Sequence, residues 1–444
     1  MLPLVLRKLS AAEFTVWSLF STIISLQGLA ELGFGVTFAR VLAYAMGGSE
    51  RLDQPHLNRG KDPNWTLMER ILATMRAVYG RLGWMLGIVL AVGGTAAVWI
   101  PITRTENRTE AWMGWGIVFA VTLYTFHANQ YSNLLQGTNH IALLRRWETL
   151  FALGSIASTV AILLWSGSLL ALVIGHQFWT ALGAFRNSRL ARWIFQGRFR
   201  SFPKAVLDSE IHASTWPSAW RSGVGSAMSF GLVQISALFH AQSANIASVN
   251  SYLLGLRLVQ AMSQFSQAPF YSKLPVFARL YAEGKLERML ALARRGMSLS
   301  YWSFVLPAAA LGFSGPYFLK LIGSSTSFPK VELWFILTGA IFVERYGAMH
   351  LQLFSVTNKI IWHIANGVTG AIIVAFWLLL YPALGATGLV LGLLIGYLGF
   401  FSWYCSRQSH RKFKLPFPRF DLGLIGMPAL LFFTAVVICL GLGR

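Results

Sequence analysis

Polar side chains with a regular spacing lie inside an apolar stretch of the chain, residues 244–284. Asn250, Arg257, Gln264 and Tyr271 recur every seven residues. Seven residues are almost two helical turns, so the four share one face that drifts by only about 20° per step. An arginine at bilayer depth costs about 2.5–3.5 kcal/mol on insertion scales, and such residues usually face a bundle interior or a watery cavity. We therefore predict a cavity wall that binds an anionic group.

Arg257 has two interpretations that the sequence leaves open. Its guanidinium group could bind a phosphate bidentately, or it could form a structural ion pair with a residue such as Glu344. Asn250 and Gln264 on the same face favour a wet surface. Glu344 and Arg345 are adjacent, so on a helix their side chains point about 100° apart. We predict that Arg345 is the second anion contact.

Glu31 is an acidic residue near the middle of an apolar stretch in the amino-terminal part of the chain, one helical turn from Gln27. Its carboxylate could neutralise Arg257, bind a coupling proton, or form an interhelical hydrogen bond or ion pair. The sequence does not choose among these roles.

The segment 124–133 is unusually polar for a stretch that otherwise reads as a membrane span. It contains His127, Asn129 and Gln130, which we assign to a hydrophilic cavity wall. His127 has the alternative of being an ordinary hydrogen-bonded interior residue. Asn250, Arg257, Gln264, Arg345, Glu31 and these three residues form the predicted binding set.

No catalytic constellation accompanies these residues. The sequence has no Walker loop, no His/Cys cluster with metal-ligand spacing and no nucleophile motif. We therefore predict a protein that is not an enzyme and that uses no cofactor and no metal. Without an ATPase signature, any transport would be driven by an ion gradient or by the gradient of the substrate, and the sequence does not say which.

The amino-acid composition predicts the kind of secondary structure that carries these side chains. The chain has 444 residues, of which 55% are hydrophobic and 12% charged, and its mean hydropathy is +0.55. Its apolar residues come in runs of about twenty, the length that crosses a hydrocarbon core of about 30 Å. The predicted fold class is an all-α polytopic membrane protein. Cys405 and Cys439 both lie in apolar runs, so no disulfide framework is implied.

The apolar runs predict twelve complete membrane spans. They are residues 14–45, 77–100, 111–135, 147–165, 168–185, 222–241, 246–272, 298–318, 332–354, 361–381, 385–405 and 421–441.

The positive charge of the chain, formally +21, gathers on one side of these spans. Most of the 37 lysines and arginines fall in one set of loops: 46–76, 136–146, 186–221, 273–297, 355–360 and 406–420. By the positive-inside rule these loops are cytoplasmic. This distribution indicates contact with anionic membrane lipids and argues against nucleic acid as a partner.

The longest basic loop, 186–221, separates five spans from seven. The first span ends with Phe38-Ala-Arg40, and a span after the loop ends with Phe277-Ala-Arg279, which suggests an internal repeat. The predicted domains are an amino-terminal lobe (1–185), a basic cytoplasmic linker (186–221), a carboxy-terminal lobe (222–405) and a second basic linker with an extra helix (406–444). If the spans that end at Arg40 and Arg279 are equivalent, the amino-terminal lobe lacks one helix, which would precede residue 10.

Three motifs resemble the Wzx-type polysaccharide flippases. The segment Leu6-Arg-Lys-Leu-Ser-Ala-Ala-Glu13-Phe14 looks like the junction that opens the family's second helix. The segment Leu29-Ala-Glu31-Leu-Gly33-Phe-Gly35, followed by Arg40, is similar to the family's Leu-Asp-Leu-Gly-hydrophobic-Gly segment with its closing arginine. The segment Leu274-Pro-Val-Phe-Ala-Arg279-Leu-Tyr281 resembles the end of its eighth helix.

The resemblance implies the multidrug/oligosaccharidyl-lipid/polysaccharide exporter fold, in which two six-helix lobes face a central cavity. It also implies translocation of polyprenyl-pyrophosphate-linked oligosaccharide, such as an O-antigen unit, across a bacterial inner membrane by alternating access. Candidate partners are then a polysaccharide polymerase or glycosyltransferases, and the polar wall with His127, Asn129 and Gln130 would contact sugars. Thr15 departs from the family's glycine, and the first helix is reduced to a remnant. Either the natural chain starts further upstream or the protein lacks that helix, which would put its activity in doubt.

Two other functions are compatible with the sequence. One is a cation-coupled drug exporter of the same fold, although that function favours acidic residues in an apolar cavity and the charges here are mainly basic. The other is a membrane scaffold of a polysaccharide synthase complex that transports nothing.

Overall fold

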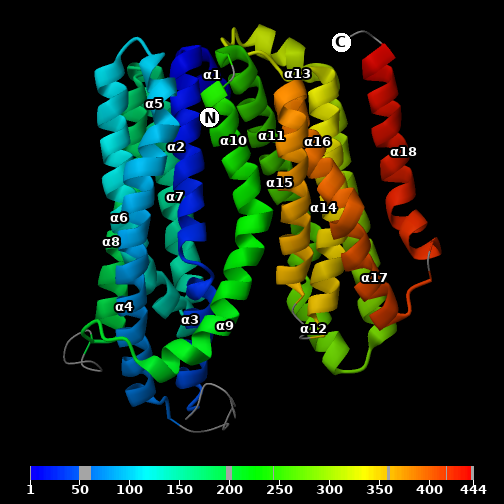
Figure 1. Cartoon of the computed structure of the whole chain (residues 1–444). Coiled ribbons are helices and arrows are strands. Elements are labelled where there is room, and N and C mark those ends of the chain that lie inside the picture. Colours follow the sequence, from blue (N-terminus) through cyan, green and yellow to red (C-terminus); the bar gives the residue numbers. More distant parts are fainter. Residues whose placement is uncertain are drawn as a thin grey trace. The chain divides into compact units, whose positions relative to one another are not determined.

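The structure is a computed structural model of the chain. It describes residues 2–49, 62–196, 203–243, 245–357, 361–416 and 418–441. Within these ranges the regular elements are all helices, as Figure 1 shows, which confirms the predicted all-α fold class. The predicted basic loops 46–76, 186–221, 355–360 and 406–420 run partly through residues outside the described ranges.

The chain divides into two compact units at Gln242. The helices of the first unit are α1 (Leu2–Lys8), α2 (Ala11–Ala30), α3 (Phe34–Met46), α4 (Trp65–Val89), α5 (Thr95–Thr103), α6 (Arg108–Gly137), α7 (Ile141–Trp165), α8 (Leu169–Ile194), α9 (Ser209–Ser226) and α10 (Leu232–Ser243). A π-helical turn at Leu90–Gly94 joins α4 to α5, and another at Ala227–Gly231 joins α9 to α10, so each pair forms one long helix.

The second unit, Ser243–Arg444, is built in the same way. Its helices are α11 (Ile246–Tyr271), α12 (Leu274–Ala282), α13 (Leu286–Leu321), α14 (Val331–Ser355), α15 (Trp362–Leu384), α16 (Ala386–Gly396), α17 (Ser402–Phe413) and α18 (Arg419–Gly441). A π-helical turn at Tyr397–Phe401 joins α16 to α17.

Every one of the twelve predicted spans lies on a helix or on a pair of consecutive helices. Among the described residues, seven helices are long and apolar enough to cross a membrane, or eight if the bent pair α2 and α3 counts as one span. The remaining predicted spans lie on α6, α8, α11 and α14, which are 25 to 30 residues long but do not meet that criterion of apolar composition. For those four helices, membrane crossing stays a prediction.

The predicted first span, 14–45, is broken rather than continuous. Leu32 (φ 47°) and Gly33 (φ 75°) take left-handed backbone conformations between α2 and α3, and the two helices meet at 45°. A side chain on Gly33 would come within 2.4 Å of the Ala219 carbonyl oxygen on α9. A side chain on Gly223 of α9 would come within 2.8 Å of the Leu32 backbone. The break therefore exists because the backbone of α9 packs directly against it.

That contact also explains why the chain divides later than the sequence predicts. We expected 186–221 to be a linker and the second lobe to begin at 222. In the structure, Arg186–Ile194 continues α8, and α9 packs on α3 as part of the first unit. Basic residues at the end of a helix have the composition of a connector, which is why the first compact unit ends at Gln242 while the predicted lobe ends at 185. The predicted domain bounds stay a prediction.

The start of α9 is tied to α4 by an ion-pair cluster. Asp208 caps α9 and accepts a hydrogen bond from Arg70 Nε at 2.7 Å, while Arg70 Nη2 lies 2.7 Å from Glu210. Partial burial alone would raise the pKa of Asp208. Hydrogen bonds from Arg70 and from the backbone N–H groups of Ile211 and Glu210 outweigh that effect and hold this pKa below its usual range.

The motif around Ser10 begins α2 with a capping box. The Ser10 hydroxyl accepts a hydrogen bond from the Glu13 backbone N–H at 3.3 Å, and the Ser10 N–H donates to Glu13 Oε2 at 2.9 Å. The backbone N–H groups of Ser10 and Glu13 have no acceptor within the helix itself, and these two hydrogen bonds supply one for each. They therefore fix where α2 begins. The segment that resembles a flippase junction therefore has a local structural role.

Candidate functional site

The first unit contains a cavity of about 610 Å³ between α2, α6, α7 and α8. Its polar lining comes from all four helices and consists of Gln27, Thr125, Asn129, Ser132, Glu148, Ser155, Thr159, His176, Thr180, Arg186 and Asn187. Apolar residues such as Ile24, Phe151 and Ile156 complete the wall. A volume of this size falls in the range of small-molecule sites, about 300–1,000 Å³.

Close packing of α7 on α8 sets one wall of the cavity. Gly154 on α7 faces the ring of Trp179 on α8, where a Cβ would come within 2.5 Å of the indole. The Trp179 indole N–H then donates to the Ser158 hydroxyl at 2.8 Å. Glycine at this position lets the large ring lie flat against α7.

Amide and hydroxyl groups link the helices across the cavity. The amide group of Gln27 on α2 lies 3.1 Å from the Thr125 hydroxyl on α6. Asn187 Nδ2 on α8 donates to the Ser132 hydroxyl on α6 at 3.0 Å. In the part of the chain that the structure describes, Asn187 Oδ1 is buried without a hydrogen-bond partner. This acceptor is therefore unused, and side chains around it would have to move before a ligand hydroxyl could reach it.

Arg186 is the cation of this cavity. Its guanidinium carbon lies 5.8 Å from the ring centre of Trp147 and 5.5 Å from that of Phe151, both on α7. Its Nε and Nη1 atoms are buried and have no hydrogen-bond partner among the described residues. Nearby Glu148 also lines the cavity, but its carboxylate accepts from Arg145 at 2.7 Å. The rings of Trp147 and Phe151 hold the guanidinium group of Arg186 in place, and its Nε and Nη1 donors make no hydrogen bond to the described residues.

Glu31 and Asn129 of the predicted set meet in the structure. Glu31 is the C-cap of α2, and its Oε1 accepts from Asn129 Nδ2 on α6 at 2.9 Å. The Tyr79 hydroxyl hydrogen-bonds to the same carboxylate and accepts from Asn133 Nδ2 at 2.6 Å. A Cβ at Gly35 would lie 2.0 Å from Glu31 Oε2, so the glycine of the motif makes room for the carboxylate.

His127 and Gln130 lie on other faces of α6 and do not line the cavity. His127 Nδ1 lies 2.9 Å from the Leu123 carbonyl oxygen, and its ring packs where Gly83 of α4 has no side chain. Gln130 Nε2 donates to the His127 carbonyl oxygen at 2.9 Å. Both are bonded within their own helix, and their predicted contact with sugars remains a prediction.

Asn250, Arg257 and Gln264 lie on α11 in the second unit, but their environments differ. Asn250 is buried, Arg257 is half-buried and Gln264 is exposed. The shared helix face therefore does not give the three side chains the same surroundings. Their predicted roles in substrate binding stay predictions.

Arg345 on α14 is fully buried in the second unit, with 1% of its surface exposed. Its Nη2 donates to the Ser263 carbonyl oxygen on α11 at 3.0 Å and to the Ser263 hydroxyl. Nε and Nη1 have no hydrogen-bond partner in the described residues. This geometry joins α14 to α11, and the predicted anion contact would require a ligand to reach the interior of that pair.

The sequence interpretation missed Arg186 because it assigned the residue to a cytoplasmic connector. The aromatic residues that hold it, Trp147 and Phe151, are four residues apart on α7 and therefore share a helix face. That spacing was a readable signal, and the short connection at 166–168 makes α7 and α8 antiparallel neighbours. Arg186 was missed because the predicted span ended at residue 185.

Comparison with known proteins defines the fold. No protein-family profile and no curated protein matches the chain. Among solved structures, the chain is similar to those of transporters of the MOP superfamily. The chain superposes on the Lipid II flippase MurJ in its inward closed conformation with a TM-score of 0.63 and 10% identity. The match covers 99% of this chain and 95% of that one.

Two further neighbours are MATE transporters. An inward-facing multidrug resistance MATE family transporter of the MOP superfamily gives a TM-score of 0.58 at 13% identity, covering 91% of this chain and 93% of that one. The Vibrio cholerae MATE transporter VcmN in its bent form gives 0.54 at 14% identity, covering 95% and 96%. At these identities the likeness shows the fold, which confirms the superfamily fold predicted above. Membership of the Wzx-type family stays a prediction.

Proposed function

We propose that the protein is a flippase that translocates polyprenyl-pyrophosphate-linked oligosaccharide across the bacterial inner membrane for surface polysaccharide synthesis, by alternating access. The observation that supports this most directly is Arg186, a cation with unused buried N–H donors in the wall of a polar cavity. The fold supports it as well, since one neighbour of the same fold is a lipid II flippase.

The chemistry of the cavity fits the two parts of such a substrate. A pyrophosphate carries concentrated negative charge, and a guanidinium group binds phosphate oxygens through two parallel N–H donors. The amides and hydroxyls of Gln27, Ser132 and Asn187 offer the mixed donors and acceptors that sugar hydroxyls need. Arg257 and Arg345 are proposed as further anion contacts in the second unit.

Substitution of Arg186 tests the proposal in cells that depend on the protein for a surface polysaccharide. We expect Arg186→Ala to reduce polysaccharide export at least tenfold, since one charge-assisted hydrogen bond is worth about 1.5–3 kcal/mol. Arg186→Lys should retain part of the export, because it keeps the charge but loses the planar donors. Arg189→Ala is the matched control, because Arg189 lies on the same helix but is exposed and stacks on Phe185.

Full export by Arg186→Ala at normal expression would refute the phosphate role of Arg186. Export is read as the surface polymer itself, and the expression of each variant is measured in the same membranes. Neighbouring glycosyltransferase genes on the chromosome would independently support the pathway.

The second candidate function, a cation-coupled drug exporter, is favoured by the Glu31 network. A carboxylate held by Asn129 and Tyr79 at a helix break could bind a proton or a cation. This function predicts that expression raises resistance to cationic drugs and that Glu31→Gln abolishes the effect.

A third possibility is the non-transporting scaffold. It predicts that glycosyltransferases co-purify with the protein and that Arg186→Ala leaves polysaccharide levels unchanged.

A further inference from the structure

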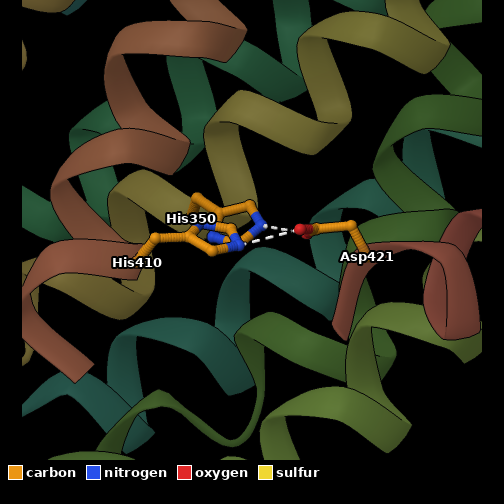
Figure 2. A group of neighbouring side chains, drawn as sticks. All are labelled: His350, His410 and Asp421. Carbon is orange, nitrogen blue, oxygen red and sulfur yellow. Dashed lines mark hydrogen bonds and ion pairs between the residues drawn. The ribbon is translucent and has the colours of Figure 1, made fainter. Parts of the chain in front are cut away.

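A separate polar cluster lies in the second unit and takes no part in the site described above. It consists of His350 on α14, His410 on α17 and Asp421 in the first turn of α18, and Figure 2 shows the three side chains pointing toward one another. One ligand atom from each residue lies within 4.8 Å of the others. The side chain of His350 is 0% exposed, that of Asp421 9% and that of His410 13%.

His410 shows that a positive charge belongs in this cluster. Its Nδ1 lies 2.8 Å from the Ser406 carbonyl oxygen, which can only accept, so Nδ1 carries a hydrogen. In the neutral ring, Nε2 then has a lone pair, and it lies 2.8 Å from Asp421 Oδ2. Two lone pairs repel each other at this distance. A proton on either atom or a bound cation must therefore stand between them.

His350 distinguishes between these two possibilities. Its Nε2 lies 3.4 Å from Asp421 Oδ1, beyond the usual 2.7–3.2 Å of a nitrogen–oxygen hydrogen bond. Within the described residues, neither ring nitrogen of His350 has a hydrogen-bond partner. Buried polar groups are rarely left in that state. A proton on His410 leaves His350 unsatisfied, whereas a cation among the three side chains uses its Nε2 as well.

We propose that His350, His410 and Asp421 bind a divalent transition-metal ion of the zinc type. Two imidazole nitrogens and one carboxylate are a common zinc ligand set, with a water molecule available for the fourth position. In a tetrahedral site, ligands about 2.0–2.2 Å from the ion lie about 3.3–3.6 Å apart. The His350 Nε2–Asp421 Oδ1 distance of 3.4 Å fits this spacing, and the His410 Nε2–Asp421 Oδ2 distance of 2.8 Å would have to widen by about half an ångström.

Outer hydrogen bonds support two of the three ligands, Asp421 and His410, as they usually do in metal sites. The Tyr346 hydroxyl donates to Asp421 Oδ1 at 3.0 Å, and the Ser406 carbonyl oxygen fixes the ring of His410. Outer hydrogen bonds of this kind orient ligands and select the histidine tautomer. The ring of Phe420 lies 6.4 Å from that of His350 and 6.3 Å from that of His410, which adds apolar packing around the cluster.

The ion would join three helices at one point. Its ligands come from α14, α17 and α18, and the last of these is the helix that the sequence places beyond the twelve-helix core. Because the ion binds the folded arrangement and not the unfolded chain, binding adds to the stability of the second unit. The site is therefore a structural metal site rather than a part of the substrate pathway.

The test uses the full-length protein purified in detergent without chelators. We expect about one equivalent of zinc per chain after equilibration with Zn²⁺ and desalting, measured by elemental analysis. Replacing zinc by Co²⁺ should give the visible absorption of a tetrahedral cobalt centre. Asp421→Asn and His410→Ala should weaken Zn²⁺ binding at least tenfold and remove that absorption, while the control His212→Ala in the first unit should match the wild type.

Absence of stoichiometric zinc and of the cobalt spectrum in the wild-type protein would overturn the proposal and leave a protonated His410–Asp421 ion pair. Equal Zn²⁺ affinity in Asp421→Asn and the wild type would overturn it too. The wild-type measurement decides the matter even if a variant does not fold. Size-exclusion chromatography of each variant shows whether lost binding reflects a lost ligand or a lost fold.

Discussion

Glu31 closes α2 at a position where a carboxylate is electrostatically unfavourable. It is the C-cap residue, next to the partial negative charge of the last helix carbonyl groups. The Asn129 amide and the Tyr79 hydroxyl offset this by donating hydrogen bonds to the carboxylate. Gly35 supplies the space that the carboxylate occupies. The interhelical hydrogen bond foreseen as one role of Glu31 is therefore present, and binding of a coupling proton remains a proposal.

We expect Asn129→Asp to destabilise the first unit by about 1–3 kcal/mol. The substitution replaces a donor with an acceptor 2.9 Å from Glu31 Oε1, so a charge-assisted hydrogen bond becomes a repulsion. The melting temperature of the detergent-purified protein at neutral pH measures the effect. Gln130→Glu is the control, because it adds the same charge one residue away, where the side chain bonds only to its own helix. Equal melting of the two variants would contradict this account of Glu31.

At the scale of elements, the junction between α2 and α3 organises the first unit. Its left-handed residues turn the chain by 45°, and the backbone of α9 lies against the turn at Gly33 and Gly223. The same break places Glu31 beside α6. One glycine-rich motif thus fixes both the path of the chain and the position of a buried charge.

Gly33→Ala should destabilise the protein strongly. A left-handed conformation costs a residue with a Cβ about 1–2 kcal/mol, and the new atom would also meet the Ala219 carbonyl oxygen, which is backbone and cannot swing away. Gly80→Ala on α4 is the matched control, since nothing lies within 4 Å of its Cβ. Removing that helical glycine should be neutral or stabilising by up to about 1 kcal/mol. Thermal unfolding of the two variants compares them, and a Gly33→Ala protein as stable as Gly80→Ala would show that α9 does not fix the break.

At the scale of the whole molecule, the basic loops predict which ends of the helices face the cytoplasm. Cys405 and Cys439 are both buried, so the natural chain offers a low background for thiol labelling. Cysteines introduced at exposed loop or helix-end positions can therefore report sidedness in intact cells.

Labelling with a membrane-impermeant maleimide should separate two matched variants. Glu106→Cys lies in a short connection between α5 and α6 that we expect outside, and should be labelled in intact cells. Glu287→Cys lies in the first turn of α13, within a basic region that we expect inside, and should be labelled only after permeabilisation. The reverse pattern would invert the topology, and labelling of both from outside would disprove the span count between them.

Much of this architecture is determined by the sequence itself. Hydropathy and helical periodicity depend on neighbours along the chain, and they located every helix that carries a predicted span. The capping box at Ser10 and the glycines around Glu31 are likewise local, so their motifs could be read directly. Contacts between side chains on different helices could not be predicted in this way. The pairing of Glu31 with Asn129 joins residues 98 apart, and the sequence offered no reason to connect them.

The two sites depend on tertiary structure for the same reason. Arg186 becomes a cavity residue only because α8 continues past 185 and packs against Trp147 and Phe151 of α7. His350, His410 and Asp421 have no spacing typical of a metal motif, and they meet because α14, α17 and α18 bring their ends together. Side chains on different helices are juxtaposed by packing, which single-chain patterns do not encode. The sequence therefore determined that the protein is helical and predicted charged residues within its spans, and the tertiary structure decided which side chains share a site.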